Sequence, residues 1–410
     1  MASFRPLRYK RNNTYTCLTS HFQPSTIQPS NFINHSPNPI SSNNLSLSGM
    51  EHFTKKLAKR KQENALRVLP SSNHSLVDFC SNDYLGFATV NSEIHNLPSG
   101  ATGSRLLKGN HTIHEKTEAF LADYHNSEAA LLFNSGYTAN LGLISTITER
   151  THIVLYDELS HASLREGIQL SHAKSFSFKH NSLTDLKEKL SKWHGKVIWV
   201  ITESVFSMDG DIAPLHEMAS ICHQYQAHLI VDEAHALGVF GMHGKGLINE
   251  LKLENKVFAR IVTFGKALGS HGAAVLGSKL LIDYLVNFCR AFIYTTALPP
   301  SQVAHILSQY KTLANGIAQE QLTKNIALFT SKLYNLSSLI PSKSAIQCIV
   351  VPGNNKVKAV AASFQQAGFD VRPILSPTVP SGQERLRICL HSFNTTEEIN
   401  SLTKLIKEIG

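Results

Sequence analysis

Short apolar runs alternate with longer stretches of helical period between residues 100 and 300. This alternation indicates a mostly parallel sheet that is covered by helices on both faces. Six runs are predicted as strands: residues 129–133, 152–156, 197–201, 228–231, 261–263 and 273–277. Ligands bind at the carboxyl ends of the strands in such a sheet. We therefore expect residues 100–300 to form a large α/β domain with a site at that edge.

The pattern changes after Pro299 and Pro300, where a long helical stretch leads into a region of mixed elements. The last helix has Thr395 as its predicted N-cap, and Glu398 stands three residues later, which is the spacing of a capping box. Three strands are predicted near residues 346–351, 370–373 and 385–390. We therefore predict a smaller α+β domain over residues 301–410.

The first hundred residues show two different patterns. Residues 51–99 predict an amphipathic helix running toward Leu69 and a short strand at 77–80. Residues 1–50 are rich in Ser, Asn, Thr and Pro and contain no Asp or Glu, which predicts a disordered tail. Its basic start fits an organellar transit peptide. A helical pattern begins at Met50, however, so we favour translation from that residue and a cytoplasmic location.

Composition argues against several classes of protein. The chain of 410 residues is 42% hydrophobic and 17% charged, which is typical of globular proteins, and it has no run of about 18 apolar residues that could span a membrane. The net charge of +9 is scattered, which argues against nucleic acid binding and suits an anionic substrate such as an acyl coenzyme A. Six cysteines without a CxxC pair predict reduced thiols, and 21 histidines without an HExxH motif predict no metal.

Lys266 is the first candidate for chemistry. It follows one predicted strand and lies in a glycine-rich turn, where its amine can reach an aldehyde without a crowding backbone. Asp232 follows another strand, where a carboxylate can stay ionised beside a protonated pyridine nitrogen. Either residue alone is more often a surface lysine or an N-capping aspartate. Together they predict a site for pyridoxal 5'-phosphate (PLP).

Other turns carry groups that suit the same cofactor. Gly136 stands where a strand leads into a helix, so backbone N–H groups there can bind a phosphate. The hydroxyls of Thr263 and Ser207 can reach the same phosphate. His161 can stack on the pyridine ring, and His235 can hydrogen-bond its phenolate oxygen. Each of these residues alone is more often structural, but their coincidence at strand ends favours the cofactor.

Two arginines suggest how a substrate could be held. Arg385 and Arg387 alternate with Leu386 along a predicted strand, so their guanidinium groups share one face. Arginine binds a carboxylate through paired hydrogen bonds, which suits an amino acid. Two surface arginines on an edge strand would give the same pattern, and the sequence leaves both readings open.

From about residue 51 to residue 410 the chain resembles the α-oxoamine synthases, a branch of the fold type I PLP enzymes. The motifs that carry the resemblance are SNDYLG, GATGSRLLKGNH, FNSGYTAN, DELSHAS, TESVFSMDGDIAPL, VDEAHALGVFG, TFGKALG and RLRICL. The resemblance implies PLP as the cofactor, a large mostly parallel sheet domain and a smaller C-terminal domain. It does not cover residues 1–50.

Position by position, the resemblance implies that Lys266 bonds covalently to PLP and that Asp232 pairs with the ring nitrogen. It implies that His161 stacks on the ring and that His235 contacts the phenolate oxygen. The implied phosphate contacts are Gly136, Tyr137, Ser207 and Thr263, with Thr295 and Thr296 supplied by a second subunit. A homodimer with shared active sites follows. The residues placed near the substrate are Arg67, Asn82 and Arg387.

Several activities occur among the α-oxoamine synthases. The segments SHGAAVLGS and FIYTTALPPS favour the condensation of L-alanine with a pimeloyl thioester in biotin synthesis. The resemblance thus implies a PLP-dependent acyltransferase that releases CO2 and its acyl carrier, which is coenzyme A or a carrier protein. One alternative is a sister synthase that joins glycine to acetyl-CoA. Another is a catalytically silent scaffold subunit, against which the intact Lys266 argues.

Overall fold

The computed structural model describes residues 50–69, 75–90 and 96–409. The chain divides into two compact units, one ending at Lys56 and one beginning at Leu57. The boundary falls inside helix α1 (Glu51–Gln62), in which no residue is buried. The sheets and the other helices belong to the second unit. The tail predicted for residues 1–50 lies almost wholly outside the described residues.

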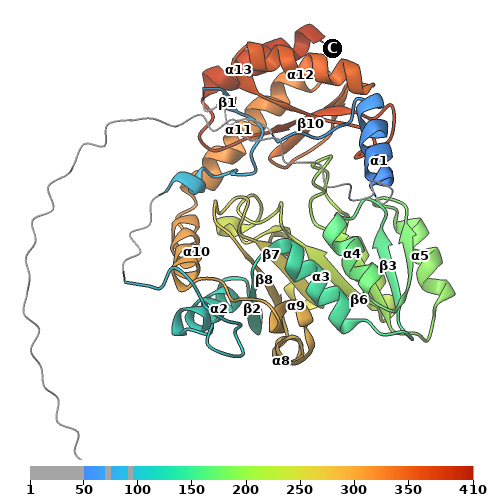
Figure 1. Cartoon of the computed structure of the whole chain (residues 1–410), viewed down its shortest axis with the longest axis vertical. Helices are drawn as coiled ribbons and strands as arrows, with labels where there is room; N and C mark the ends of the chain where they lie inside the picture. The colour runs from blue at the N-terminus through green and yellow to red at the C-terminus, as the bar shows by residue number, and fades with distance from the viewer. Residues whose placement is uncertain (1–49, 70–74, 91–95, 410) are drawn as a thin grey trace, which may run out of the picture. The chain divides into compact units, whose positions relative to one another are not determined.

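A seven-stranded sheet runs through residues 129–277 (Figure 1). In spatial order its strands are β2 (Ala129–Phe133), β8 (Ala273–Gly277), β7 (Ala259–Thr263), β6 (His228–Asp232), β5 (Ile198–Glu203), β3 (Ile153–Asp157) and β4 (Lys174–Phe178). The neighbouring strands from β7 to β4 are parallel to one another. Strand β8 runs antiparallel to both of its neighbours, β2 and β7. The predicted mostly parallel sheet is confirmed.

Helices cover both faces of this sheet, and alternate strand residues supply the two cores. Ile230 points to one face, while Leu229 and Val231 point to the other. The first face packs against α3 (Gly136–Ile147), α4 (Ala162–Leu170), α8 (Lys279–Phe288) and α9 (Arg290–Ile293). The second packs against α5 (Leu183–Lys192), α6 (Leu215–Gln224) and α7 (Leu247–Glu250). Burial on both faces explains why these strands are continuously apolar.

The C-terminal part contains a four-stranded antiparallel sheet. Its strands, in order, are β12 (Arg372–Ile374), β13 (Arg385–Cys389), β10 (Ile346–Val350) and β9 (Leu339–Ile340). The helices packed in the same core are α11 (Ile317–Leu333), α12 (Asn354–Gln366) and α13 (Thr396–Ile409). Strand β1 (Val77–Asp78) pairs in parallel with β11 (Phe369–Asp370), which attaches the segment around residue 80 to this part of the molecule.

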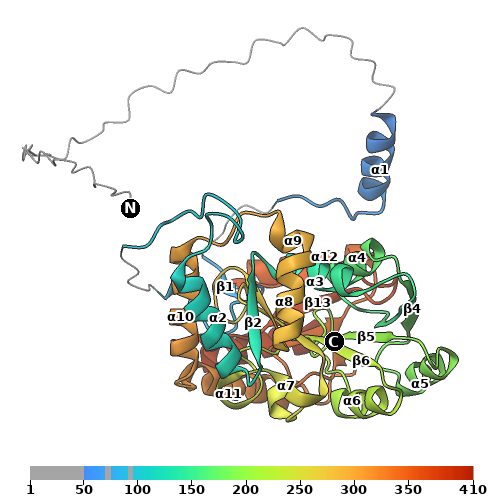
Figure 2. The same cartoon turned by 90° about the horizontal axis from the view of Figure 1, so that it is seen from below.

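Helix α10 (Pro300–Leu313) joins the two sheets in sequence and packs beside α2 (Thr112–Tyr124), as Figure 2 shows. The same apolar core includes residues of α2, α10 and the C-terminal sheet. Short 3-10 turns complete the described elements at Phe87–Thr89, Met242–Gly244 and Glu254–Lys256. The fold class, α/β with a smaller C-terminal α+β part, is the expected one.

Several elements differ from the sequence prediction, of which three are explained by their local sequence. Helix α1 stops at Gln62 rather than near Leu69, because Asn64 adopts a left-handed conformation with φ 51° that ends a helix. Strand β4 was not predicted, since its residues KSFSF are largely exposed and show no apolar run. The strand predicted at residues 370–373 is divided between β11 and β12, and Pro373 is tolerated because β12 lies at a sheet edge.

Candidate active site

The carboxyl ends of the parallel strands bring acidic residues to one edge of the large sheet. Glu203 ends β5 and Asp232 ends β6, and the two are paired in the strand register. Thr263 ends the neighbouring strand β7, and the loop that follows it carries Lys266. These residues thus lie together at the sheet edge where the sequence pattern predicts a site.

Asp232 is buried and held by hydrogen-bond donors. Its Oδ2 accepts from the Asn140 side chain at 2.7 Å, and its Oδ1 accepts from the Ala234 backbone at 2.9 Å. Asn140 also donates to Ser163 Oγ at 3.0 Å, so helices α3 and α4 both help to place Asp232.

Lys266 is half-buried, and its Nζ lies 2.7 Å from Nε2 of His235. Burial lowers the pKa of Lys266 to about 8, against the opposing attraction of Asp232 and Glu203. The pKa of His235 is also lowered well below its ordinary value. Burial is the larger cause, and the positive charge of Lys266 is the next. The site therefore contains a neutral imidazole beside an amine that deprotonates near neutral pH.

His161 is the N-cap of α4, and its side chain is exposed. The ring Nδ1 lies 2.7 Å from Ser163 Oγ, and its backbone N–H donates to Glu203 Oε1 at 2.7 Å. Burial, followed by the negative charge of Asp232, raises the pKa of Glu203 to about 8. The Glu203 carboxyl therefore keeps its proton to a higher pH than an ordinary carboxyl group does.

The structure also fits a phosphate at the start of α3. Ser135 caps this helix, and a Cβ atom on Gly136 would lie 2.4 Å from Thr263 Oγ1, so only glycine fits there. Among the described residues the buried Thr263 hydroxyl has no hydrogen-bond partner. An unpartnered hydroxyl beside a helix N-terminus suits an anion. Tyr137 follows Gly136 and is exposed on the same turn.

Arg387 reaches across from the C-terminal sheet. Its Nε donates to the Ser207 carbonyl at 2.7 Å, and another guanidinium nitrogen donates to Asn82 Oδ1 at 3.0 Å. Arg385 stands two residues earlier on β13 but forms an ion pair with Asp209. Of the two readings that the sequence left open, binding of a substrate carboxylate stays a prediction for Arg387, while Arg385 is already paired with a carboxylate of its own chain.

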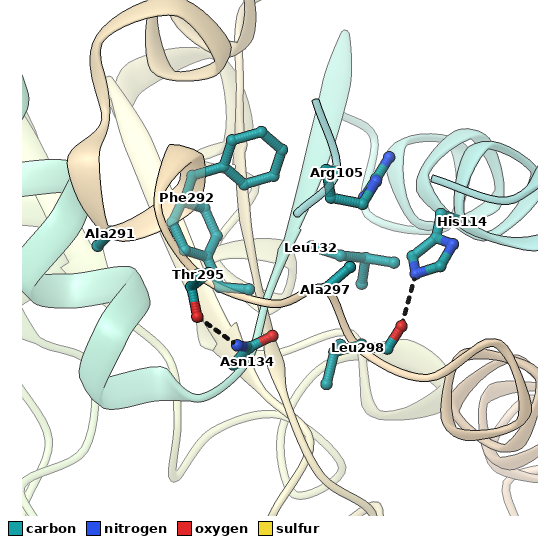
Figure 3. Close-up of a pocket in the computed structure, with 10 residues that line it drawn as sticks. Arg105, His114, Leu132, Asn134, Ala291, Phe292, Thr295, Ala297 and Leu298 are labelled. Atoms are coloured by element: carbon teal, nitrogen blue, oxygen red, sulfur yellow. Dashed lines mark hydrogen bonds between the residues drawn. The ribbon is translucent and has the colours of Figure 1, made fainter. Parts of the chain in front are cut away.

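Three predicted residues lie outside this cluster. Arg67 is exposed and donates to Thr378 Oγ1 at 3.3 Å. The hydroxyl of Thr295 accepts a hydrogen bond from the Asn134 side chain of the same chain at 3.0 Å, in a small pocket that Figure 3 shows. The Thr296 carbonyl accepts from the same amide group at 2.8 Å. A contribution of Thr295 and Thr296 to a second subunit stays a prediction.

Sequence reasoning missed four residues that surround the predicted ones: Tyr84, Asn140, Ser163 and Glu203. All four belong to the motifs SNDYLG, FNSGYTAN, DELSHAS and TESVFSMDGDIAPL, which were the available signal. Their roles depend on contacts between distant segments, which those motifs do not reveal.

The described residues hold no group of three His, Cys, Asp or Glu side chains that could bind a metal. The five described cysteines are unpaired, and Cys17 lies outside the described residues. No described helix is both long and apolar enough to cross a membrane.

Known proteins resemble the chain over most of its length. The family model for aminotransferase class I and II matches residues 74–406. The 8-amino-7-oxononanoate synthase of Emericella nidulans is 41% identical and aligns with 86% of this chain and 92% of its own. That of Marinobacter nauticus is 36% identical, over 87% of this chain and 96% of its own.

Solved structures agree with these relatives. A serine palmitoyltransferase from S. paucimobilis with bound PLP has a TM-score of 0.81 and 26% identity, covering 89% of this chain and 98% of its own. The 8-amino-7-oxononanoate synthase from Francisella tularensis has a TM-score of 0.70 and 32% identity, covering 82% and 98%. The fold is therefore that of the fold type I PLP enzymes. The chain belongs to the aminotransferase class I and II family, and within it to the α-oxoamine synthases, with PLP as its cofactor.

Proposed function

We propose that the protein condenses L-alanine with a pimeloyl thioester and releases CO2 and the acyl carrier, giving 8-amino-7-oxononanoate for biotin biosynthesis. The observation that carries this proposal is the placement of Lys266 beside His235 at the strand end next to Asp232. The curated relatives support the choice of reaction, since those named above are 8-amino-7-oxononanoate synthases. A cytoplasmic location is part of the proposal, or an organellar one if residues 1–50 are a transit peptide.

The residues at the sheet edge would hold PLP by its ring nitrogen, one face of its ring and its phosphate. The Asp232 carboxylate would pair with the ring nitrogen, and the ring of His161 would cover one face. The phosphate would be bound by the backbone at Gly136 and Tyr137 and by the hydroxyls of Ser207 and Thr263. When bound, PLP withdraws electrons from the amino acid and makes its Cα–H bond acidic.

Lys266 would then remove the Cα proton. Its pKa of about 8 leaves part of the amine neutral near neutral pH, which a general base requires. The imidazole of His235 lies in hydrogen-bond contact with Lys266 and can hold the amine in position. His235 would also contact the cofactor's phenolate oxygen.

Arg387 and Asn82 would bind the amino acid carboxylate, since the two side chains touch each other and Arg387 also reaches from the C-terminal sheet to the Ser207 carbonyl. A guanidinium group with only one strong partner on each nitrogen retains donors for a carboxylate. Arg67 would lie near the far end of the acyl chain, where its exposed guanidinium could meet the carboxylate of a pimeloyl group.

A homodimer is also part of the proposal. Three large apolar residues lie at four-residue spacing along α8 and remain exposed: Leu280 (79%), Tyr284 (38%) and Phe288 (60%). Residues at this spacing share one helix face, and an apolar face of this kind suits burial by a second copy. Tyr294, which is 79% exposed, follows in sequence just before Thr295 and Thr296. Sedimentation of the purified protein tests this state.

The test of function is a panel of assays for the free thiol that the acyl carrier, coenzyme A or carrier protein, releases. We expect turnover with alanine and pimeloyl-CoA, or with alanine and pimeloyl carrier protein, and little with glycine and acetyl- or succinyl-CoA. A preference for glycine and acetyl-CoA would identify a sister synthase instead. Borohydride should bleach the yellow holoprotein, since it reduces the bond between Lys266 and PLP. A colourless protein that binds no PLP would indicate a silent scaffold subunit.

A further inference from the structure

A histidine just after the edge strand β4 lies between two carboxylates. His180 Nδ1 lies 2.9 Å from Asp157 Oδ1, and its Nε2 lies 2.8 Å from Asp211 Oδ2. Asp157 is the last residue of β3, whereas Asp211 belongs to a turn at residues 205–212 that follows the neighbouring strand β5. One imidazole ring therefore connects a strand end of the large sheet to this turn.

The two partners determine the charge of His180. An ionised carboxylate accepts hydrogen bonds and cannot donate them, so a ring between two of them carries a proton on each nitrogen. Burial opposes this charge, but the hydrogen bonds and negative charges of Asp157 and Asp211 outweigh it and raise the pKa of His180 to about 10. The Asp157 side chain is fully buried, and those of His180 and Asp211 are 24% and 23% exposed, so solvent ions screen these pairs only weakly.

The residue after His180 contacts the same two carboxylates. The Asn181 backbone donates to Asp157 Oδ2 at 2.9 Å, and its side-chain amide donates to Asp211 Oδ2 at 2.7 Å. That amide nitrogen also lies 3.3 Å from His180 Nε2, but its bond to the carboxylate is the shorter one. The His180 backbone donates to Glu158 Oε1 at 3.0 Å, which holds the loop against the end of β3. The charged ring is therefore fixed in one orientation.

The turn that contains Asp211 also contains Ser207. The Phe206 N–H donates to the Asp211 carbonyl at 3.0 Å across this turn, and the His180 ring packs edge-on against the Phe206 ring. The Ser207 hydroxyl is a proposed phosphate contact, and the Ser207 carbonyl accepts from Arg387 Nε at 2.7 Å. A displacement of Asp211 would therefore move Ser207 as well.

The C-terminal sheet holds this turn from another side, since Arg385 forms an ion pair with Asp209. That bond fixes the turn relative to the smaller sheet. The other hydroxyl proposed for the phosphate, that of Thr263, ends strand β7 of the large sheet. The bond between His180 and Asp211 attaches the turn to the large sheet too, which is the reference that Ser207 needs to lie at the right distance from Thr263.

We propose that His180 is a positioning residue for the cofactor, whose imidazolium ring joins Asp211 to Asp157 and thereby places the Ser207 hydroxyl where it meets the PLP phosphate. The proposal rests on the proposed function in one respect, that Ser207 contacts this phosphate. His180 acts through the turn. A neutral side chain in its place would leave two carboxylates close together without a cation between them.

The first experiment measures PLP binding to the full chain by absorbance titration in a double-mutant cycle. His180→Gln and Ser207→Ala should each weaken binding about tenfold, the effect of one lost hydrogen bond. The double variant should also lose about tenfold, because the displaced Ser207 has already lost its contact. Thr263→Val combined with His180→Gln should lose about a hundredfold, since Thr263 is placed independently by β7.

A second variant gives the same test without altering the histidine. Asp211→Ala removes the carboxylate on the turn and leaves His180 paired with Asp157, so it should reproduce the tenfold loss and show no further loss with Ser207→Ala. Asp185→Ala is the matched control, because Asp185 accepts from the Lys179 backbone in the same loop at 2.7 Å. It should leave PLP binding unchanged. Independent, multiplying losses in the double variants, or unaltered PLP binding by His180→Gln or Asp211→Ala, would overturn the proposal.

The charge of the ring is measured separately. Nitrogen-15 NMR of the histidine-labelled full chain at pH 8, where an ordinary histidine is neutral, should show two protonated nitrogens for a signal that is missing from His180→Gln. A neutral His180 at this pH would contradict the proposal. If Ser207→Ala alone bound PLP normally, the phosphate contact would be wrong and the proposal with it. Neither measurement needs a substrate, so a protein that passes both but prefers glycine would refute the proposed reaction and leave the role of His180 standing.

Discussion

Asp232 and Glu233 are neighbours in sequence but face two regions of opposite character. Asp232 faces the sheet edge that carries Lys266 and is held by a neutral amide of Asn140. Glu233 faces a buried ion-pair cluster, where its Oε2 accepts from Arg260 Nε at 2.9 Å and both side chains are almost inaccessible. Arg260 also donates to the His125 carbonyl at 2.9 Å. In this cluster the charged groups meet each other directly.

The two regions share the features that are often taken as signs of a site. Each contains a buried histidine whose pKa lies well below its usual range, and each histidine touches a buried tyrosine. The two regions differ in which polar groups lack a partner of opposite charge or a hydrogen bond. At the sheet edge the amine of Lys266 meets an imidazole rather than a carboxylate, and the Thr263 hydroxyl has no partner among the described residues. Unmatched groups, more than burial, distinguish the site from the buried ion-pair cluster.

The largest expected effect is that of Lys266→Ala. Turnover should fall below detection, while the protein folds and still binds PLP without a covalent bond. Folding should not suffer, because burial already disfavours the Lys266 ammonium group and lowers its pKa to about 8. Coenzyme A release and urea denaturation measure the two effects. Lys192→Ala on the exposed side of α5 is the control, and substantial turnover by Lys266→Ala would refute its assigned role.

A matched pair of carboxylate-to-amide changes separates the two regions most directly. Asp232→Asn should cost about 3–5 kcal/mol of transition-state stabilisation with little change in the free energy of unfolding. Glu233→Gln should cost about 3–5 kcal/mol of folding stability, because it leaves the buried charge of Arg260 unpaired. Steady-state kinetics of both variants measure the loss of transition-state stabilisation, and urea denaturation measures the loss of folding stability. Equal losses of stability in the two variants would show that the two regions do not differ in this respect.

Glu203 provides a pH-dependent test at the sheet edge. Its pKa rises from 4.5 to about 8 on folding, so between these values the folded protein binds the proton that the unfolded chain releases. This contribution to stability is fully present at low pH and is lost as the pH rises toward 8. Glu203→Gln should therefore gain stability relative to the unaltered protein, by at most about 1.4 kcal/mol per pH unit in this window. A difference that does not change with pH would show that Glu203 is ionised in the folded protein.

The smallest expected effect is that of Thr263→Val, which keeps the shape of the side chain and removes its hydroxyl. The cofactor-free protein should become more stable by about 1 kcal/mol, because an unpartnered buried hydroxyl is lost. PLP should bind about tenfold more weakly, since one hydrogen bond to the phosphate disappears. Thr117→Val, another buried hydroxyl without a partner but outside the site, should show the gain in stability and no change in PLP binding.

Much of the sheet could be predicted because its strands are buried on both faces. The apolar runs at 129–133 and 273–277 match β2 and β8 to the residue. Strand β4 escaped prediction because its exposed residues carry no such run. The site was predictable where chemistry is local, as for Lys266 in its turn. Tyr84 was not, because its contact with His235 joins residues 151 positions apart.

The sequence by itself determined the strand pattern, the glycine-rich turns and the kinds of group available at the strand ends, because these depend on neighbouring residues. Only the tertiary structure decided which group meets which. Arg385 and Arg387 have the same local pattern, yet one is paired with Asp209 and the other reaches Asn82. Whether a hydrogen bond or ion pair forms depends on differences of a few tenths of an ångström in the distance between its two groups. Such distances arise when elements from distant parts of the chain pack together.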